Sequence, residues 1–188
     1  MWRKNRNDQN RCYGVDLNRN YDSNWGGPGS SGDACSDSYR GSGPFSEPES
    51  TAHSNLIMDL QKTTDNSIQA YLTFHSYSQL VIFPYGKDFT SVPSNYDELA
   101  ALGQSTAKAI FDVHGKTYVT GQTTETLYPA AGGSDDWAFE DGPVRLSYTF
   151  ELRDTGEYGF KLPENQIQPT AEEVIEGVKV IGKYVLDL

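Results

Sequence analysis

Short strand-like runs alternate with helix-length amphipathic segments along most of this sequence, and this alternation limits the folds open to it. Residues 70–75 and 144–151 combine β-branched and aromatic side chains, as buried strands do. Between them, residues 93–113 place leucine, isoleucine and valine on one face of an expected helix, which Gly115 would end. Strands and helices that alternate in this way predict an α/β fold.

Other segments fit the same pattern. Residues 48–61 predict a helix with Leu56, Ile57 and Leu60 on its apolar side. No internal repeat or linker divides the sequence, so we assign residues 1–188 to one domain. The remaining expected elements are short strands at 13–17 and 79–85, a strand followed by a loop over 117–128, a helical turn at 135–139, and a C-terminal helix that begins near Pro169.

The charge of the chain restricts its partners. The sequence has 26 Asp and Glu residues against 15 Lys and Arg residues, a formal net charge of −11. Because phosphate backbones are anionic, this charge argues against a nucleic-acid partner. No apolar run approaches the length that a membrane span requires. We therefore expect neither nucleic acid nor membrane among the partners.

The two cysteines bear on the compartment. Cys12 and Cys35 are the only ones, and neither belongs to a Cys-x-x-Cys pair. A disulfide between them would close a loop rich in Gly and Ser and stabilise the fold by about 3 kcal/mol. Two free thiols in a reducing compartment are the alternative. We favour the disulfide, and with it a secreted, extracellular protein.

Two titratable side chains end the strand-like runs. His75 stands where α/β sheets commonly place functional groups, although a single strand-end histidine is more often only packed or hydrogen-bonded. Burial of Glu151 would raise its pKa and suit it to general-base catalysis; an ion pair with Arg153 or Arg145 is the structural alternative. A catalytic zinc needs about three protein ligands, and the residue pattern alone assembles no such set.

Four segments, in this order, resemble those of the pancreatic-type zinc metallocarboxypeptidases. They are VDLNRNYD, FHSYSQLVIFPYG, GGSDDW and TFELRDTGEYGF, and WRKNR at the start and Tyr128 before PAAGGS follow the same pattern. The resemblance covers nearly the whole chain. It implies a mixed, mostly parallel eight-stranded sheet with helices on both faces, of which this chain would supply the C-terminal strands and helices.

The resemblance also implies a reaction, in which zinc-activated water hydrolyses the C-terminal peptide bond of a substrate. Glu151 would be the general base, His75 a zinc ligand, and Arg3 the group that stabilises the oxyanion. Asn18 and Arg19 would grip the terminal carboxylate, because a guanidinium can meet both oxygens. The other implied roles are Tyr128 as a cap on that carboxylate, Asp16 as partner of a zinc-ligating histidine, Ser76, Tyr77 and Phe160 as substrate contacts, Gly86, Thr123 and Leu127 as walls of the specificity pocket, a disulfide between Cys12 and Cys35, and cis peptide bonds after Ser76, Pro84 and Arg153.

One position bears on the choice of substrate. Asp135 falls where B-type relatives carry Asp and A-type relatives carry an aliphatic residue. With a Lys or Arg side chain, this carboxylate would form a charge-assisted bond of about 1.5–3 kcal/mol. The alternative is that Asp135 caps the helix that follows, a role that Asp136 could fill as well. We therefore expect the partners to be peptides and proteins that end in Lys or Arg.

The chain departs from the family at one motif. The family's His-x-x-Glu motif, which supplies the other two zinc ligands, has no match here, because Leu56, Ser78 and Thr117 stand three residues after the histidines. We expect a two-chain enzyme cut before Met1, whose N-terminal chain brings these ligands; alternatively, the sequence is part of a longer chain. The alternative function is a non-catalytic module, or an inactive fragment, that recognises basic C-termini. A serine hydrolase is disfavoured, since no Gly-x-Ser-x-Gly motif occurs.

Overall fold

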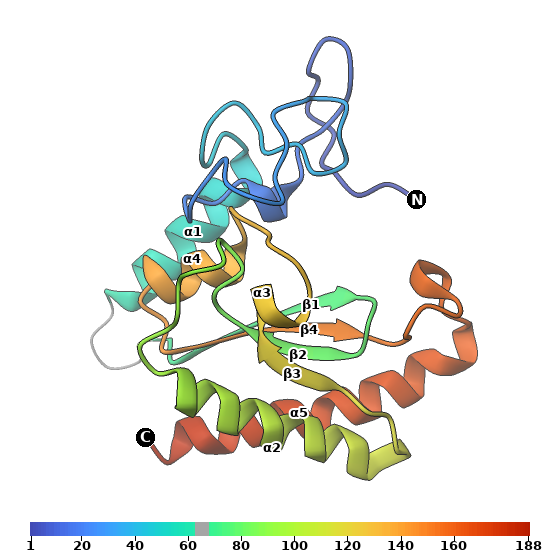
Figure 1. Ribbon diagram of the computed structural model, residues 1–188. Helices are drawn as coiled ribbons and strands as arrows, with labels where there is room; N and C mark the ends of the chain where they lie inside the picture. The colour runs from blue at the N-terminus through green and yellow to red at the C-terminus, as the bar shows by residue number, and fades with distance from the viewer. Residues whose placement is uncertain (63–67) are drawn as a thin grey trace.

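A computed structural model describes residues 1–62 and 68–188 and has one four-stranded sheet at its centre (Figure 1). The strand order is β1-β4-β2-β3. β1 runs parallel to β4 and β2 runs parallel to β3, while β2 and β4 are antiparallel. The sheet is therefore mixed and mostly parallel, as predicted, whereas the count of eight strands stays a prediction. The strands are β1 (Ala70–Ser76), β2 (Leu80–Phe83), β3 (Val119–Gln122) and β4 (Leu146–Leu152).

Helices cover both faces of the sheet, which confirms the expected α/β arrangement. Two long helices lie side by side on one face, and two others lie on the opposite side (Figure 1). The first pair is α2 (Tyr96–His114) and α5 (Ile167–Leu186), and the second is α1 (Pro48–Gln61) and α4 (Ser134–Glu140). The remaining helical segments are α3 (Thr123–Thr126) and the 3-10 turns η1 (Leu17–Arg19), η2 (Gly159–Lys161) and η3 (Glu164–Gln166).

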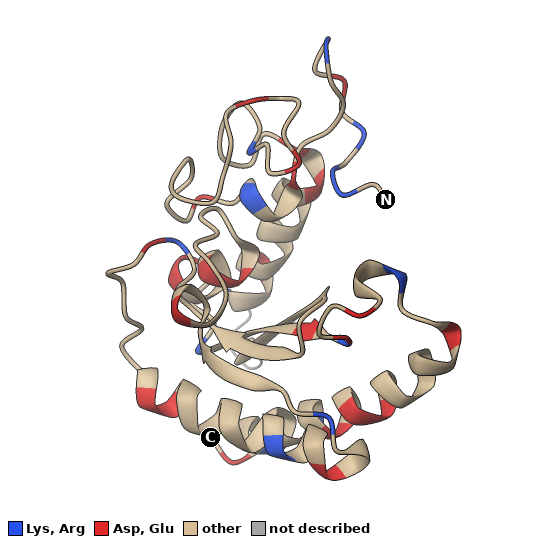
Figure 2. Cartoon of the chain, turned by 45° about the vertical axis from the view of Figure 1, so that its right-hand side comes forward, with Lys and Arg blue, Asp and Glu red and all other residues tan. Residues whose placement is uncertain are grey.

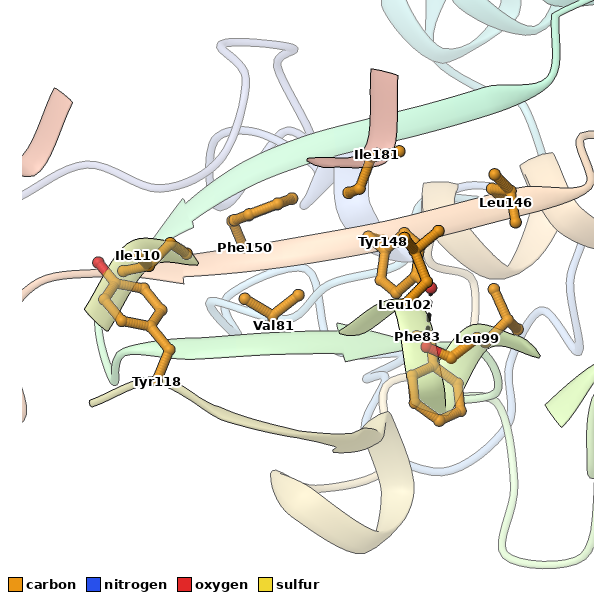
Figure 3. Packing of buried hydrophobic residues seen from close by; sticks show 10 residues of the cluster. All are labelled: Val81, Phe83, Leu99, Leu102, Ile110, Tyr118, Leu146, Tyr148, Phe150 and Ile181. Atoms are coloured by element: carbon orange, nitrogen blue, oxygen red, sulfur yellow. Dashed lines mark hydrogen bonds between the residues drawn. The ribbon is translucent and has the colours of Figure 1, made fainter. Parts of the chain in front are cut away.

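The larger core lies between the sheet and the pair α2 and α5 (Figure 3). Leu146, Tyr148 and Phe150 of β4 all point into it and are fully buried. The Tyr148 hydroxyl donates a hydrogen bond to the Leu99 carbonyl of α2 at 2.8 Å. Because side chains alternate along a strand, the residues between these three face the opposite side of the sheet.

Most expected elements lie where the sequence placed them, but residues 13–17 form no strand. Tyr13 makes only an isolated bridge with Asp8. The chain then turns into η1, where the Asp16 side chain accepts a hydrogen bond from the backbone N–H of Asn18. The polar side chain of Asp16 thus favours a helical turn over an extended run.

The predicted apolar face of α1 is also wrong in part. Ile57 is buried, whereas Leu56 and Leu60 are exposed. The small polar side chains of Ser50 and Ser54 occupy the rest of the buried face. His53 of this helix also packs against the rings of Tyr21 and Tyr71, so a polar aromatic residue supplies contacts that the leucines do not.

β1 is an edge strand among the described residues, not the buried strand that its sequence predicts. Phe74 is 49% exposed on it. Beside this edge lies an apolar groove between β1, the chain after β4, and α5. The groove is lined by Phe74, Phe160, Leu162, Ile167, Val174 and Ile175.

Two expectations from the family resemblance concern covalent geometry, and both are confirmed. Cys12 and Cys35 form a disulfide with a Cα–Cα distance of 5.2 Å. The peptide bonds Ser76–Tyr77, Pro84–Tyr85 and Arg153–Asp154 are cis. Across residues 1–62 and 68–188, no helix has both the length and the apolar character needed to cross a membrane.

A buried ion pair joins the chain after β4 to α5. Arg153 Nε donates to Glu173 Oε2 at 2.9 Å, a second guanidinium nitrogen pairs with the other oxygen, and the two side chains are 6% and 0% exposed. We expect Glu173→Ala to lower the free energy of unfolding by about 3–5 kcal/mol, because it leaves a buried cation unpaired. Urea denaturation measures this, with Glu176→Ala as the control, since Glu176 pairs with Lys179 at the surface. The control should cost less than about 1 kcal/mol; equal losses would contradict this account.

Candidate active site

A cavity of about 240 Å³ opens where β1 and β4 end. His75 and Glu151 meet there, because they are register partners on these adjacent parallel strands. The cavity collects residues from Arg3 near the N-terminus to Phe160 after β4. The predicted site residues that line it are Arg3, Asn18, Arg19, His75, Ser76, Tyr77, Thr123, Leu127, Tyr128, Asp135, Glu151 and Phe160.

Two predicted site residues lie next to the cavity and do not line it. Gly86 donates its backbone N–H to both oxygens of Asp136, at 3.0 and 2.9 Å. A Cβ atom on Gly86 would lie 2.9 Å from the Thr123 methyl group, so a larger residue would press against this wall. Asp16 accepts a hydrogen bond from Arg3 Nε at 2.8 Å. Its partner in the described chain is therefore an arginine, and its role beside a zinc-ligating histidine stays a prediction.

One carboxylate oxygen of Glu151 makes no hydrogen bond within the described residues. Its Oε2 is buried and has no hydrogen-bond partner in the described part of the chain. Arg153 pairs with Glu173 and Arg145 pairs with Glu98, so the ion pairs considered for Glu151 are both wrong. Burial raises the pKa of Glu151 to about 7, although the charge of Arg3 opposes this. Such a carboxylate can exchange a proton with a bound reactant.

His75 is suited to bind a metal but does not complete a site. Its Nε2 lies 3.3 Å from Thr73 Oγ1, and burial lowers its pKa, which favours the neutral imidazole that ligates zinc. The residues that the structure describes contain no group of three or more His, Cys, Asp or Glu side chains able to hold a metal ion. The donor set in this chain thus fits one zinc ligand, and a zinc site would need ligands from beyond the described residues.

A buried cation faces the cavity without an acidic partner. Arg19 is 5% exposed, and it donates from Nε to the Gly29 carbonyl at 2.9 Å and from Nη1 to the Asn18 carbonyl at 2.6 Å. No carboxylate of the described chain pairs with it. The side-chain oxygen of Asn18 accepts from the Ser134 N–H at 2.9 Å, which leaves its amide N–H groups for a ligand. Together with the exposed Tyr128 on the cavity wall, this arrangement suits a carboxylate ligand.

At another side of the cavity lies a carboxylate that is fixed by β4. Asp135 is 7% exposed, and its Oδ2 accepts a hydrogen bond from Thr149 Oγ1 at 3.0 Å. The alternative that Asp135 or Asp136 caps α4 is wrong, because the N-cap is Gly133 and no side chain makes the capping bond. Burial and the neighbouring Asp135 raise the pKa of Asp136 well above its usual value.

Two residues that were not predicted, Ser147 and Thr149, form a polar row on β4 together with the predicted Glu151. Ser147 Oγ donates to the Asp135 carbonyl at 2.8 Å, Thr149 holds the Asp135 carboxylate, and Glu151 follows on the same face. The alternation of apolar and polar residues over 146–151 could have revealed this row. Once Leu146, Tyr148 and Phe150 are assigned to the core, the other three must face the site.

Comparison with known proteins identifies close relatives over the whole chain. A family model described as zinc carboxypeptidase matches residues 1–177. The chain is 47% identical to carboxypeptidase B of Bos taurus over 189 residues, which cover 100% of this chain and 44% of the relative. It is 48% identical to carboxypeptidase B of Astacus astacus over 191 residues, which cover 100% of this chain and 61% of the relative. A solved structure of bovine thrombin-activatable fibrinolysis inhibitor in complex with tick carboxypeptidase inhibitor superposes with a TM-score of 0.93 at 42% identity, over 100% of this chain and 62% of that one. The chain thus spans about half the length of the curated relatives it matches.

Proposed function

This chain belongs to the zinc carboxypeptidase family, and from that premise we propose that the full-length protein removes C-terminal Lys or Arg from peptides and proteins. The observation that carries the proposal is the charge pattern of the cavity. Three groups reach one cavity. They are the buried Arg19, which pairs with no carboxylate among the described residues, the fixed carboxylate of Asp135, and the Glu151 oxygen that has no hydrogen-bond partner among those residues. A substrate that ends in a basic residue offers its terminal carboxylate to Arg19 and its cationic side chain to Asp135. Its last peptide bond would then be the one on which Glu151 acts.

Arg19 would hold the terminal carboxylate of the substrate. Two of its nitrogens are fixed by backbone carbonyls, so the guanidinium does not have to be ordered when the ligand binds. Asn18 would add an amide donor, and the Tyr128 hydroxyl would cover the carboxylate from the exposed side. Recognition of a free carboxylate restricts cleavage to the last peptide bond.

Glu151 would take a proton from the attacking water and pass it to the leaving amine. Arg3 would stabilise the negative charge that develops on the scissile carbonyl oxygen. When zinc is bound, with His75 among its ligands, it supplies Lewis-acid activation of the water and of the carbonyl. Glu151 would carry both proton transfers, and its buried Oε2, which has no hydrogen-bond partner among the described residues, supports this role.

The edge of β1 supports a further part of the proposal. We propose that an N-terminal segment carrying the His-x-x-Glu motif pairs with β1 and covers the apolar groove, because an edge strand with an exposed Phe74 is a site for strand pairing. This segment would stand on a second chain in a nicked enzyme. Intact mass spectrometry under denaturing conditions tests this detail, since two chains predict a 20.9 kDa species with a companion. A single larger mass, or a 20.9 kDa species with no companion, contradicts the two-chain proposal. The disulfide between Cys12 and Cys35 supports the proposal that the protein is secreted, because disulfides persist in oxidising compartments.

A second candidate function is binding of basic C-termini without hydrolysis. The described residues supply one histidine at the cavity and no set of three ligands, which favours a binder if no other segment completes the site. Arg19 and Asp135 would serve this function equally well. Glu151 and Arg3 would then have no chemical task.

The test compares the rates at which the full-length protein releases C-terminal Arg and C-terminal Phe from matched peptides. Each rate is measured with and without a zinc chelator. We expect Arg release to be favoured about 10- to 150-fold, as one charge-assisted bond predicts, and the chelator to abolish release of both. Tight binding of the Arg peptide without release would support the second candidate. Equal release of Arg and Phe would contradict the proposed specificity while leaving the reaction class intact.

A further inference from the structure

The segment that carries Arg3 has no helix or strand of its own. The chain near the N-terminus is an irregular trace that includes several Lys and Arg residues (Figure 2). Arg3 lines the cavity, donates to Asp16, and has a side chain that is 42% exposed. A group that acts on a transition state must be held to within about 0.5 Å. This segment therefore needs an anchor from elsewhere in the fold.

The first anchor is a close contact between two stretches of backbone. Asn5 N donates to the Val15 carbonyl at 3.0 Å, and Gly14 N donates to the Asn7 carbonyl at 2.7 Å. Val15 N donates in turn to Asn5 Oδ1 at 2.8 Å. Gly14 has a φ of +83°, and a Cβ atom on it would lie 2.2 Å from the Asn5 carbonyl oxygen. The contact is thus too close for any other residue.

The second anchor is a buried carboxylate that binds the same two asparagines. Glu47 is 2% exposed, and its Oε2 accepts from Asn5 Nδ2 at 2.7 Å and from Asn7 Nδ2 at 2.9 Å. Its Oε1 accepts from Ser46 Oγ at 2.9 Å. No cationic side chain in the described ranges pairs with Glu47. An ionised carboxylate leaves water at a large cost unless its oxygens are hydrogen-bonded, so these amide donors are what permit its burial.

The same group of residues around Glu47 also holds the residue after Arg19. Asn20 is fully buried, and its Oδ1 accepts from Glu47 N at 3.2 Å and from Ser50 Oγ at 2.6 Å. Its Nδ2 donates to Ser46 Oγ at 3.0 Å. We call Asn20, Ser46, Glu47 and Ser50 the polar hub. It connects the start of α1 to the Arg3 segment through the Glu47 side chain, and to η1 through Asn20.

We propose that Glu47 is a positioning residue for Arg3 in the reaction proposed above, on which this inference rests. The Glu47 side chain binds the Arg3 segment, whereas Asn20 is bound by the backbone of Glu47 and by the two serines. Loss of the carboxylate therefore weakens the hold on Arg3 and leaves Asn18 and Arg19 in place. The consequence is weaker stabilisation of the transition state with unchanged binding of the substrate carboxylate.

The experiment compares Glu47→Ala and Glu47→Gln in the full-length protein. Glu49→Gln is the matched control, because Glu49 also contacts Asn5, at 3.4 Å, from an exposed position. We expect Glu47→Ala to lower kcat for Arg release by about 10- to 100-fold, as a small displacement of a reacting group does, with KM and the Kd for free arginine unchanged. Glu47→Gln keeps an acceptor for both asparagines and restores most of kcat. The control stays at the wild-type level.

Three results would overturn the proposal: an unchanged kcat in Glu47→Ala, equal losses of kcat and arginine affinity, or no rescue by Glu47→Gln. If Glu47→Ala does not fold, Asn7→Ala is the second variant, because it removes one donor to Glu47 Oε2. It should lower kcat several-fold and leave the Kd for free arginine unchanged. An unchanged kcat in Asn7→Ala also overturns the proposal. Hydrogen exchange of the Val15 amide gives a readout without activity, since Glu47→Ala should speed it and Glu49→Gln should not. A wild-type protein that releases no Arg refutes the proposed function, while the exchange result still decides the anchoring.

Discussion

Glu151→Gln is expected to lower kcat for C-terminal Arg release by about 10²- to 10⁴-fold, the usual contribution of a general base. Glutamine has the shape of glutamate but cannot take a proton from water. The substitution should not disturb packing, because the native Oε2 already has no partner in the described chain. KM should change little, since the residues proposed to bind the substrate carboxylate remain. Steady-state kinetics of the full-length protein on a peptide ending in Arg measures both parameters.

Glu157→Gln is the matched control, because Glu157 is an exposed carboxylate six residues further along the chain. It should keep the wild-type kcat. A Glu151→Gln protein that binds free arginine normally and keeps more than about a tenth of the wild-type kcat would contradict the assignment of the base. In that case another group must accept the proton from the attacking water.

The sequence predicted the positions of helices and strands best where a hydrophobic period or a terminal signal was strong. The α1 bounds match the expectation, with Pro48 at the first helical position, and Gly115 ends α2 with a φ of +71°. The burial of individual faces was harder to predict. Hydrophobic spacing placed Leu56 and Leu60 against the core, but the residues that α1 buries are Ile57 and two serines, and His53 packs against Tyr21 and Tyr71. The surface that α1 meets comes from distant segments, which local spacing does not contain.

At the candidate site, too, some residues were predicted from the sequence and others were not. The family resemblance brought Arg3, Arg19 and Glu151 together before any geometry was known, because each lies in a long and specific motif. The polar hub was missed. Glu47 stands just before the expected helix at 48–61, and one asparagine that it binds is 42 positions earlier in the chain. A polar cluster built from such distant residues has no periodic signature in the sequence.

Asp135→Ile is expected to reduce kcat/KM for peptides ending in Arg by about 10- to 150-fold, and to raise it for peptides ending in Phe. The range corresponds to loss of one charge-assisted bond of about 1.5–3 kcal/mol. The carboxylate is well placed to select, because Thr149 fixes it and it is almost fully buried. An apolar side chain in the cavity would leave this charge unpaired, whereas isoleucine would remove that penalty.

Two further variants separate charge from shape at this position. Asp135→Asn keeps an acceptor for the Thr149 hydroxyl and removes the charge, so it should lose most of the Arg preference without gaining much for Phe. Asp141→Asn removes an exposed charge of the same sign from the end of α4, and it should leave both substrates unaffected if selection is local. A similar loss of Arg preference in Asp141→Asn would assign selection to the net charge of −11 and not to the cavity, since a general field attracts cations without regard to geometry. Retained Arg preference in Asp135→Ile would require a different carboxylate at the base of the pocket.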